Sequence, residues 1–459
     1  MKYSVNTDIY YGCYGEYTYV RNVADRMDYL YNEICFDILE YIRASEGCGL
    51  KQLCSHLLSI YETDSEEELC RDIEAFLKEL EEAGILKKTD IPEDAVPIEG
   101  HGDLADEPEE YIRDFIQQIC CGEQRLLTVC LELTYRCNEK CIHCYIDDPE
   151  NESSELSFSD YKKLLDDIRG LGCMGILLTG GEPTLHRDFL KIAFYAKQIG
   201  LMVDIYTNGL CMDDSMMDQL IALKPNSISF SFYGGNAQSH DIITGVPGSF
   251  EKSLRTMMMC KCAGIDTFIK TVVMKQNFDS YEELLKLGRR IHTRVLSSLS
   301  VIPTHQGRMP DEFRLMDPDK YKKILELEYQ YGLHSTRAAS GEREDYVCAS
   351  GLSALSIDPF GTVYPCNANP IVLGNIRNDE IGAIWNDSDK LRSIRSLRFN
   401  QISDRCMSCE DKNWCGICMG NAYRENGCLK PCSDTCILSK VSHEVYKNHA
   451  KGGEMNEEI

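Results

Sequence analysis

The chain has 459 residues and is 43% hydrophobic, so it can bury a large core, and its length predicts about three domains. It carries 48 Lys and Arg against 74 Asp and Glu, a formal charge of −26, which argues against the basic face that nucleic-acid binding requires. No apolar run is long enough to span a bilayer and no apolar signal segment opens the chain, so we expect a cytoplasmic protein without membrane contact. Its 24 cysteines then suit oxygen-sensitive metal clusters in an anaerobic host better than a disulfide scaffold.

The first 90 residues predict a small domain of strands and helices. Tyrosines recur between Tyr10 and Tyr19 in strand-like sequence, and three helix patterns follow before a last short strand-like run. The helix patterns cover residues 32–43, 50–60 and 65–83. This order predicts a winged-helix domain at residues 1–90. An acidic segment with three prolines, residues 90–110, predicts a linker before a helix at 111–121.

Strand-like and helical patterns alternate from residue 125 onward. Strand-like runs cover residues 126–133, 174–179, 203–206, 227–232 and 268–274. Helix patterns cover residues 159–171, 187–199, 215–223, 249–263 and 280–292. This alternation predicts a parallel sheet whose functional residues lie in the loops at the carboxyl ends of the strands.

Three cysteines directly follow the first of these strands: Cys137, Cys141 and Cys144. Their spacing suits three corners of a cubane iron–sulfur cluster and leaves the fourth iron without a protein ligand. Zinc is the alternative, but a closed zinc site needs a fourth ligand, and His143 is the only local candidate. The pattern therefore favours the iron–sulfur cluster.

Small and polar residues lie at or near the carboxyl ends of the next four strands. In chain order they are Gly180, Gly181, Glu182, Pro183, Asn208, Ser231 and Lys270. Glycines let the main chain approach a ligand closely, and a lysine on an apolar strand could neutralise a carboxylate. Ordinary interpretations also exist, because Asn208 begins a common Asn-Gly turn and Lys270 could point to solvent.

Together these features resemble the radical S-adenosylmethionine (SAM) superfamily over residues 125–310. The resemblance implies an α/β fold, a partial (β/α)6 TIM-like barrel, in which the three cysteines bind a 4Fe–4S cluster. SAM would bind the open iron, and an electron from the cluster would split SAM to a 5′-deoxyadenosyl radical. Residues 180–183 would contact the methionine ammonium, Asn208 and Ser231 the sugar and methionine ends, and Lys270 the carboxylate. His143 stands where the family usually has an aromatic ring, and it is planar too.

A second group of cysteines lies in the C-terminal part of the chain. They are Cys348, Cys366, Cys406, Cys409, Cys415, Cys418, Cys428, Cys432 and Cys436. Two Cys-x2-Cys pairs among them could close a structural zinc site, but beside a SAM cluster auxiliary iron–sulfur clusters are the simpler interpretation. The pattern over residues 354–365, with Gly361 in the turn, predicts a β-hairpin that presents Cys366.

This C-terminal region resembles the SPASM extension of radical SAM enzymes, which typically carries two auxiliary clusters. The resemblance implies that one cluster is held by Cys406, Cys409, Cys415 and Cys436, and three corners of the other by Cys348, Cys366 and Cys418. Two residues separate Cys415 from Cys418 where the family usually has three. The fourth ligand of the nearer cluster is therefore open among Cys428, Cys432 and a substrate thiolate.

The N-terminal pattern resembles the precursor-recognition domain of enzymes that modify ribosomally made peptides. In such a domain the leader of the precursor adds as a strand to an exposed sheet edge. We therefore expect a recognition domain, an acidic linker with a helix, a radical SAM core, a SPASM domain and a flexible tail. Their predicted boundaries are 1–90, 91–124, 125–330, 331–445 and 446–459.

These resemblances imply an oxidoreductase that abstracts a hydrogen from a precursor peptide and joins the carbon to a cysteine sulfur as a thioether. An auxiliary cluster would accept the leftover electron, and a donor such as ferredoxin or flavodoxin would reduce the enzyme. Alternatives are carbon–carbon or carbon–oxygen cross-links, epimerisation with Cys428 or Cys432 as hydrogen donor, and formylglycine formation in a sulfatase. A different class, an iron–sulfur regulator with a winged helix, would need a basic recognition helix, which the charge balance disfavours. The sequence identifies no catalytic acid or base.

Overall fold

The computed structural model of this chain describes residues 2–45, 47–61, 63, 65–88, 108–147, 155–333 and 346–453. The chain forms two compact units, one from residues 1–127 with 172–174 and the other from 128–171 with 175–459. Most of the predicted acidic linker and the end of the predicted tail lie outside the described residues. The finer division into five parts stays a prediction.

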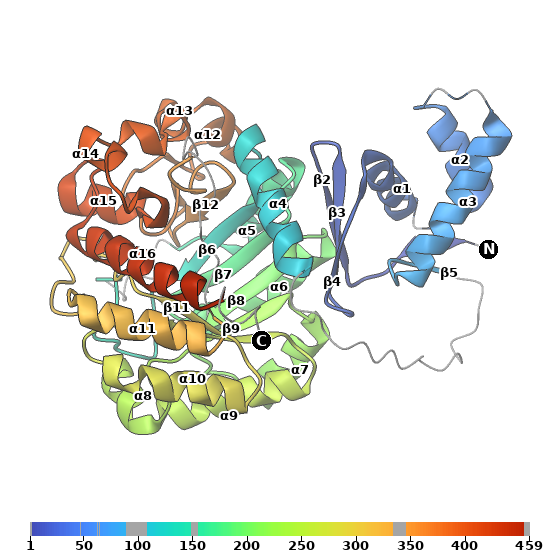
Figure 1. Ribbon diagram of the computed structural model, residues 1–459. Helices are drawn as coiled ribbons and strands as arrows, with labels where there is room; N and C mark the ends of the chain where they lie inside the picture. The colour runs from blue at the N-terminus through green and yellow to red at the C-terminus, as the bar shows by residue number, and fades with distance from the viewer. Residues whose placement is uncertain are drawn as a thin grey trace. The chain divides into compact units, whose positions relative to one another are not determined.

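The N-terminal unit contains a three-stranded antiparallel sheet in the order β2 (Ile9–Tyr14), β3 (Tyr17–Asn22) and β4 (Met27–Asn32) (Figure 1). Tyr14 pairs with Tyr17, so Gly15, with a φ of +60°, lies in a tight turn that favours glycine. The helices of the unit are α1 (Glu33–Ala44), α2 (Leu50–Leu58), α3 (Glu66–Glu82) and α4 (Pro108–Glu123). Apolar residues at helical spacing, such as Leu39 on α1 and Leu77 on α3, form its core.

The three predicted N-terminal helices are confirmed as α1, α2 and α3. The strand that follows them, β5 (Leu86–Lys88), pairs antiparallel with β1 (Tyr3–Val5) at the start of the chain. In the described part of the chain β5 pairs with no other strand, so it does not form the second strand of a wing hairpin. The winged-helix assignment is therefore not confirmed.

The second unit is built on six parallel strands that run in sequence order across one sheet. They are β6 (Thr128–Thr134), β7 (Gly175–Gly180), β8 (Met202–Thr207), β9 (Ser227–Ser231), β10 (Thr267–Val272) and β11 (Val295–Ser298). The helices between them are α5 (Phe158–Gly170), α6 (Phe189–Gln198), α7 (Asp214–Leu223), α8 (Ala237–Thr244), α9 (Ser249–Cys262) and α10 (Tyr281–Arg290). The predicted α/β class with a partial TIM-like barrel is confirmed, and the sequence patterns missed only α8 and β11 within this part.

The barrel sheet continues into the C-terminal region. β12 (Ala354–Ile357) pairs in parallel with β6, and β13 (Thr362–Tyr364) and β14 (Gly374–Asn375) follow antiparallel. The predicted hairpin is confirmed, because Ser356 pairs with Tyr364 and Gly361 turns between them with a φ of +88°. The remaining helices are α11 (Pro318–Gln330), α12 (Ile381–Asp387), α13 (Asp389–Ser396), α14 (Asp404–Met407), α15 (Met419–Asn426) and α16 (Ser433–Gly453). α11 and α16 lie side by side (Figure 1).

The two faces of the barrel strands differ in polarity. On β6, Val129, Leu131 and Leu133 are fully buried, whereas Cys130 and Glu132 belong to the opposite face because side chains alternate along a strand. β10 repeats the pattern, with Ile269 buried and Lys270 half-buried. The apolar face packs under the helices, and the inner face carries the polar groups.

In the described residues, no helix is long and apolar enough to cross a membrane.

Candidate functional site

The cysteine loop starts where β6 ends. Cys137, Cys141 and Cys144 are all half-buried. The Cys144 N–H donates to the Cys141 carbonyl at 3.1 Å, the Glu139 N–H donates to the Cys137 sulfur at 3.4 Å, and the Cys141 thiol donates to a Glu139 carboxylate oxygen at 3.3 Å. The loop is therefore held by its own hydrogen bonds.

Burial makes these thiols weak acids. Burial is the largest cause that raises the pKa of Cys137 to about 12; charges at Glu182, Glu139 and Cys144 contribute to the rise, and the hydrogen bond from the Glu139 N–H opposes it. Burial also raises the pKa of Cys141 well above its usual value, with contributions from Glu139, Cys137 and Cys144. These mutual effects place the three thiols close to one another. Metal binding must remove their protons, because the thiolate is the ligand.

The donor set fits a cluster better than a single ion. Among the described residues no three His, Cys, Asp or Glu side chains converge on a position that could hold one metal ion. In a cubane each thiolate binds a different iron, so the sulfurs stand further apart than in a zinc site. His143, the candidate fourth zinc ligand, instead packs edge-on against Tyr233 with 4.6 Å between ring centroids. Burial lowers its pKa to about 4, so the ring is neutral.

Gly180 and Gly181 bring β7 against the strand that leads into the cysteine loop. The φ of Gly180 is +127°, and a Cβ on it would lie 2.3 Å from the Thr134 carbonyl oxygen. A Cβ on Gly181 would lie 2.3 Å from the Arg136 carbonyl oxygen. The Gly181 and Glu182 N–H groups donate at 2.8 Å to the carbonyls of Thr134 and Arg136. Only glycine permits this approach, which fixes the start of the loop.

Glu182 is fully buried and joins the ends of β7 and β8. Its carboxylate accepts from the Thr184 N–H at 3.1 Å and hydroxyl at 2.6 Å, from the Thr207 hydroxyl at 2.8 Å, and from the Asn208 N–H at 2.8 Å. Burial raises its pKa, and these donors oppose that rise. Because its carboxylate accepts hydrogen bonds from the chain itself, Glu182 supports the loop.

Asn208 also contacts the cysteine loop. Its side-chain amide donates to the Asn138 side-chain oxygen at 2.6 Å and lies 3.8 Å from the Cys137 sulfur. The Asn208 carbonyl accepts from Ser253 at 2.5 Å. The predicted polar contact to SAM stays a prediction, and in this structure the amide contacts the residue next to Cys137.

Ser231 and Lys270 are register partners on β9 and β10. The Lys270 ammonium donates to the Tyr206 hydroxyl at 2.6 Å and lies 3.9 Å from that ring's centroid. Burial lowers the pKa of Lys270 to about 8, while charges at Cys130 and Asp204 oppose that shift. Lys270 therefore lies on the inner face of the sheet and does not point to solvent. On that face its ammonium could neutralise an anionic ligand.

The C-terminal cysteines form two groups. Burial raises the pKa of Cys366 to about 11, and charges at Cys418 and Cys348 add to that rise, so these three thiols are neighbours. The pKa of Cys436 is raised by burial and by Cys406 and Cys409, which places those three together. Each group is part of a ligand set implied by the resemblance, and the complete sets, with Cys415 in the second, stay predictions. Of the candidates for the open ligand position, Cys428 is exposed and Cys432 is buried beside Glu425.

Glu132 on β6 is a buried acid that sequence patterns do not single out, because one glutamate in an apolar strand usually faces solvent. It is 2% exposed and accepts a hydrogen bond from the Tyr145 hydroxyl at 2.6 Å and a longer one from the Tyr135 hydroxyl at 3.4 Å. Burial raises its pKa to about 7, and the two tyrosines and Arg424 limit that rise. Both tyrosines flank the three cysteines in sequence.

Two family descriptions match this chain. Residues 131–288 match the radical SAM superfamily, and residues 348–410 match SPASM, an iron–sulfur cluster-binding domain. AdoMet-dependent heme synthase of Methanosarcina barkeri is 27% identical over 325 residues, covering 64% of this chain and 92% of the relative. Mycofactocin maturase MftC of Mycolicibacterium smegmatis is 28% identical over 315 residues, covering 64% and 79%.

A solved structure resembles nearly the whole chain. Streptococcus suis SuiB bound to its precursor peptide SuiA superposes with a TM-score of 0.60 at 16% identity. The match covers 95% of this chain and all of SuiB, which shows a likeness of fold that includes the N-terminal unit.

Proposed function

We propose that this chain, which matches the radical SAM superfamily over residues 131–288 and SPASM over residues 348–410, is an enzyme that modifies a ribosomally made precursor peptide. The modification we propose is a thioether between a cysteine sulfur and a carbon of the same peptide. We place the protein in the cytoplasm.

The proposed site joins three groups of cysteines. Cys137, Cys141 and Cys144 would hold the SAM cluster, while Cys348, Cys366 and Cys418 would hold three corners of the nearer auxiliary cluster. The second auxiliary cluster would be held by Cys406, Cys409, Cys415 and Cys436. When bound, these clusters supply the electron that cleaves SAM and accept the electron left over when the new bond forms. Lys270 and Ser231 on the inner face would orient SAM.

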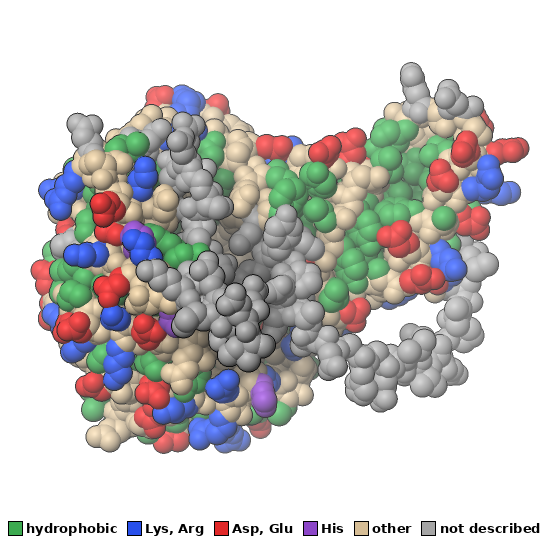
Figure 2. Space-filling model, viewed as in Figure 1, with side chains coloured by type: hydrophobic (Ala, Val, Ile, Leu, Met, Phe, Trp, Pro, Cys, Tyr) green, Lys and Arg blue, Asp and Glu red, His purple; other side chains and the backbone are tan. Residues whose placement is uncertain are grey.

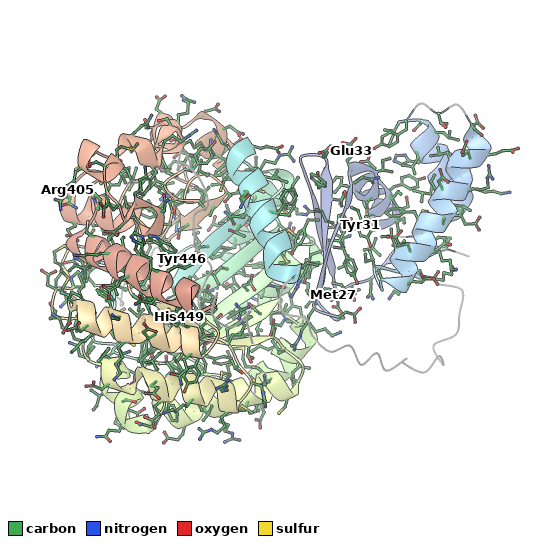
Figure 3. The ribbon with its side chains drawn as sticks, viewed as in Figure 1. Met27, Tyr31, Glu33, Arg405, Tyr446 and His449 are labelled. Atoms are coloured by element: carbon green, nitrogen blue, oxygen red, sulfur yellow. The ribbon has the colours of Figure 1, made fainter. Side chains whose placement is uncertain are left out.

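The proposal of a peptide substrate rests on an unpaired sheet edge in the N-terminal unit. Among the described residues β4 pairs only with β3, so its other edge is open to an added strand. Tyr31 on β4 packs at 5.4 Å against Phe76 of α3, and Met27 on the same strand is 40% exposed. Figure 3 shows Met27 and Tyr31 on β4, and Figure 2 shows hydrophobic side chains gathered on this unit.

A leader peptide added to β4 would be bound by main-chain hydrogen bonds and by apolar side chains entering the space beside Tyr31. The structure of SuiB supports this proposal, because SuiB there is bound to a precursor peptide. The heme synthase relative supports a different substrate on the same barrel, a tetrapyrrole, for which the N-terminal unit would have no described use.

The test is an anaerobic reaction of the iron-loaded chain with SAM, a low-potential reductant such as reduced flavodoxin or ferredoxin, and a short Cys-containing precursor peptide, to be sought among the reading frames beside its gene. We expect the peptide to lose two hydrogen atoms as 5′-deoxyadenosine accumulates. Cys141→Ala should abolish both products, whereas Cys262→Ala, an exposed thiol on α9, should leave both unchanged.

Three outcomes would contradict parts of this proposal. Iron near four per chain, instead of about twelve for three cubanes, would remove the auxiliary clusters. SAM cleavage with conversion of a tetrapyrrole and no change in any peptide would replace the substrate class. Modification of a sulfatase-derived cysteine peptide without a leader would favour formylglycine formation.

A further inference from the structure

Glu132 occupies an unusual position for an acid. It lies on the inner face of β6, it is 2% exposed, and among the described residues no lysine, arginine or histidine forms an ion pair with it. The charge of Arg424 lowers the pKa of Glu132, but the Arg424 guanidinium donates its hydrogen bonds to the carbonyls of Ala368 and Thr304. Burying a carboxylate without a paired cation costs folding free energy. Such a residue is therefore a candidate for a functional role.

Tyr145 connects Glu132 to both cysteine loops. Its hydroxyl donates to Glu132 at 2.6 Å, its backbone directly follows Cys144, and its side chain also interacts with Asn367, which directly follows Cys366. The chain Glu132, Tyr145, Asn367 therefore runs from the SAM cluster loop to the auxiliary cluster loop. Short hydrogen bonds of this kind can carry a proton.

Aromatic rings enclose this chain of hydrogen bonds. His305 packs against Tyr145 at 5.1 Å and against Tyr135 at 5.3 Å, and Phe360 packs edge-on against Tyr135 at 5.5 Å. Burial lowers the pKa of His305 to about 4, so this histidine is neutral. These rings are themselves half-buried, and they limit the access of water, the competing proton acceptor, to the hydrogen bond between Tyr145 and Glu132.

The proposed thioether reaction needs a proton acceptor. After hydrogen abstraction, the carbon radical bonds to a substrate thiol, the S–H bond breaks, and one proton and one electron remain. The electron would go to the iron–sulfur cluster that Cys348, Cys366 and Cys418 would hold. The proton needs a base near the two loops that carry Cys144 and Cys366.

We propose that Glu132 accepts this proton through the Tyr145 hydroxyl, which takes the thiol proton and passes its own to the carboxylate. This inference rests on the proposed function, because it concerns the bond-forming step of that reaction. Glu132 is thus a positioning and proton-holding residue that acts through Tyr145, and Tyr145 is the group that meets the substrate.

The pH behaviour of Glu132 depends on all groups that face it. They are Tyr135, Cys144, Tyr145 and His305 in or near the cysteine loop, Asp358 and Tyr364 on the hairpin, Arg424 on α15, Cys130 on β6, and Tyr161 on α5. The pKa of Glu132 is raised to about 7, mainly by burial. The carboxylate must be deprotonated to accept a proton, so product formation should rise with pH through about 7.

The experiment compares Glu132→Gln with Glu328→Gln in the reaction with SAM and the precursor peptide. Glu328 is a matched control, because it is a half-buried acid whose pKa is also raised by burial and which accepts from Tyr281 at 2.9 Å and Ser297 at 2.5 Å beside β11. We expect Glu132→Gln to slow cross-linking at least about 100-fold while iron content and 5′-deoxyadenosine release stay at wild-type levels. Its residual rate should lose the rise near pH 7, and Glu328→Gln should retain wild-type behaviour.

A spectroscopic measurement tests the same group without turnover. In the metal-free chain labelled with 13C-glutamate, one carboxyl resonance that titrates near pH 7 should disappear in Glu132→Gln. Wild-type cross-linking by Glu132→Gln would overturn the inference, and so would loss of iron or of SAM cleavage, which would make Glu132 a support of the loop. A wild-type enzyme that cleaves SAM but cross-links no peptide would instead overturn the proposed function.

Discussion

The cysteine loop at residues 137–144 and the cysteines between residues 406 and 436 present their thiols in different ways. The first three thiols are half-buried in a loop fixed by Glu182, by Asn208 and by two glycines at the end of β7. In the second group Cys409, Cys428 and Cys436 are exposed. Cys406 of the same group lies on the four-residue helix α14, and Cys436 lies near the start of α16.

The difference concerns what holds each set of ligands before metal binds. The barrel supplies hydrogen bonds to the first loop from three strands, so its geometry is fixed by the fold. Apart from Cys436 on α16, the second group lies on short helices and turns, which are marginal without packing or a metal. The first site is therefore preformed, and the second depends on its cluster for order.

Removal of iron should give the largest difference between the two groups of cysteines. Chelation under anaerobic conditions should expose residues 399–436 to limited proteolysis at least about tenfold faster, because cluster binding contributes folding energy there. The barrel, residues 128–298, should persist as an intact fragment. Mapping the cleavage sites by mass spectrometry checks this, and first cuts within 137–144 would reverse the comparison.

Glu182→Ala should damage the preformed site most among single substitutions. It leaves the Thr184, Thr207 and Asn208 donors without an acceptor in the core, and unpaired buried donors cost about 1–3 kcal/mol each. We expect the metal-free chain to lose at least about 3 kcal/mol of unfolding free energy in urea. Glu251→Ala, at an exposed position on α9, should change it by less than about 0.5 kcal/mol.

Acid should lower the free energy of unfolding through His240 on α8. His240 is fully buried, its ring accepts from the Tyr233 N–H at 3.2 Å, and burial lowers its pKa to about 4, against the opposing charge of Asp241. The unfolded chain binds a proton on this ring near pH 6.5, so the ring's contribution to stability is lost as pH falls from there toward 4.

Between pH 7.5 and pH 5.0 this contribution amounts to about 2 kcal/mol. His240→Gln, which keeps an acceptor, should reduce the acid loss of the metal-free chain by that amount in urea titrations at the two pH values. An unchanged pH dependence in the variant would show that His240 is already protonated in the folded chain.

The smallest effect is expected at the surface of the C-terminal region. Lys322 on α11 and Glu444 on α16 form a 2.6 Å ion pair, but their side chains are 41% and 55% exposed. Lys322→Ala should change the unfolding free energy by no more than about 0.5 kcal/mol, since solvent screens such pairs. A larger loss that disappears in high salt would show that charge pairing, and not the cluster, orders this region.

Periodic patterns predicted most of the barrel, because alternation along strands and helical spacing are local properties. The five predicted strands lie within a few residues of β6 to β10. The roles of individual polar residues were harder to predict. The predicted contacts of residues 180–183 and of Asn208 with SAM stay predictions, and the sequence did not indicate that the Glu182 and Asn208 side chains bond to Thr207 and Asn138, because these contacts join segments far apart in sequence. No sequence pattern indicated a role for Glu132, since its hydrogen-bond partners Tyr135 and Tyr145 contact it only after the loop folds back.

The pairing of β12 with β6 links the two metal-binding loops through one continuous sheet. β6 leads to Cys137, and the hairpin that begins with β12 leads to Cys366, so no flexible tether separates them. Neighbouring strands keep a spacing of about 4.8 Å that thermal motion barely alters. Electron tunnelling between the two centres would then run over a nearly constant distance, whatever peptide the enzyme holds.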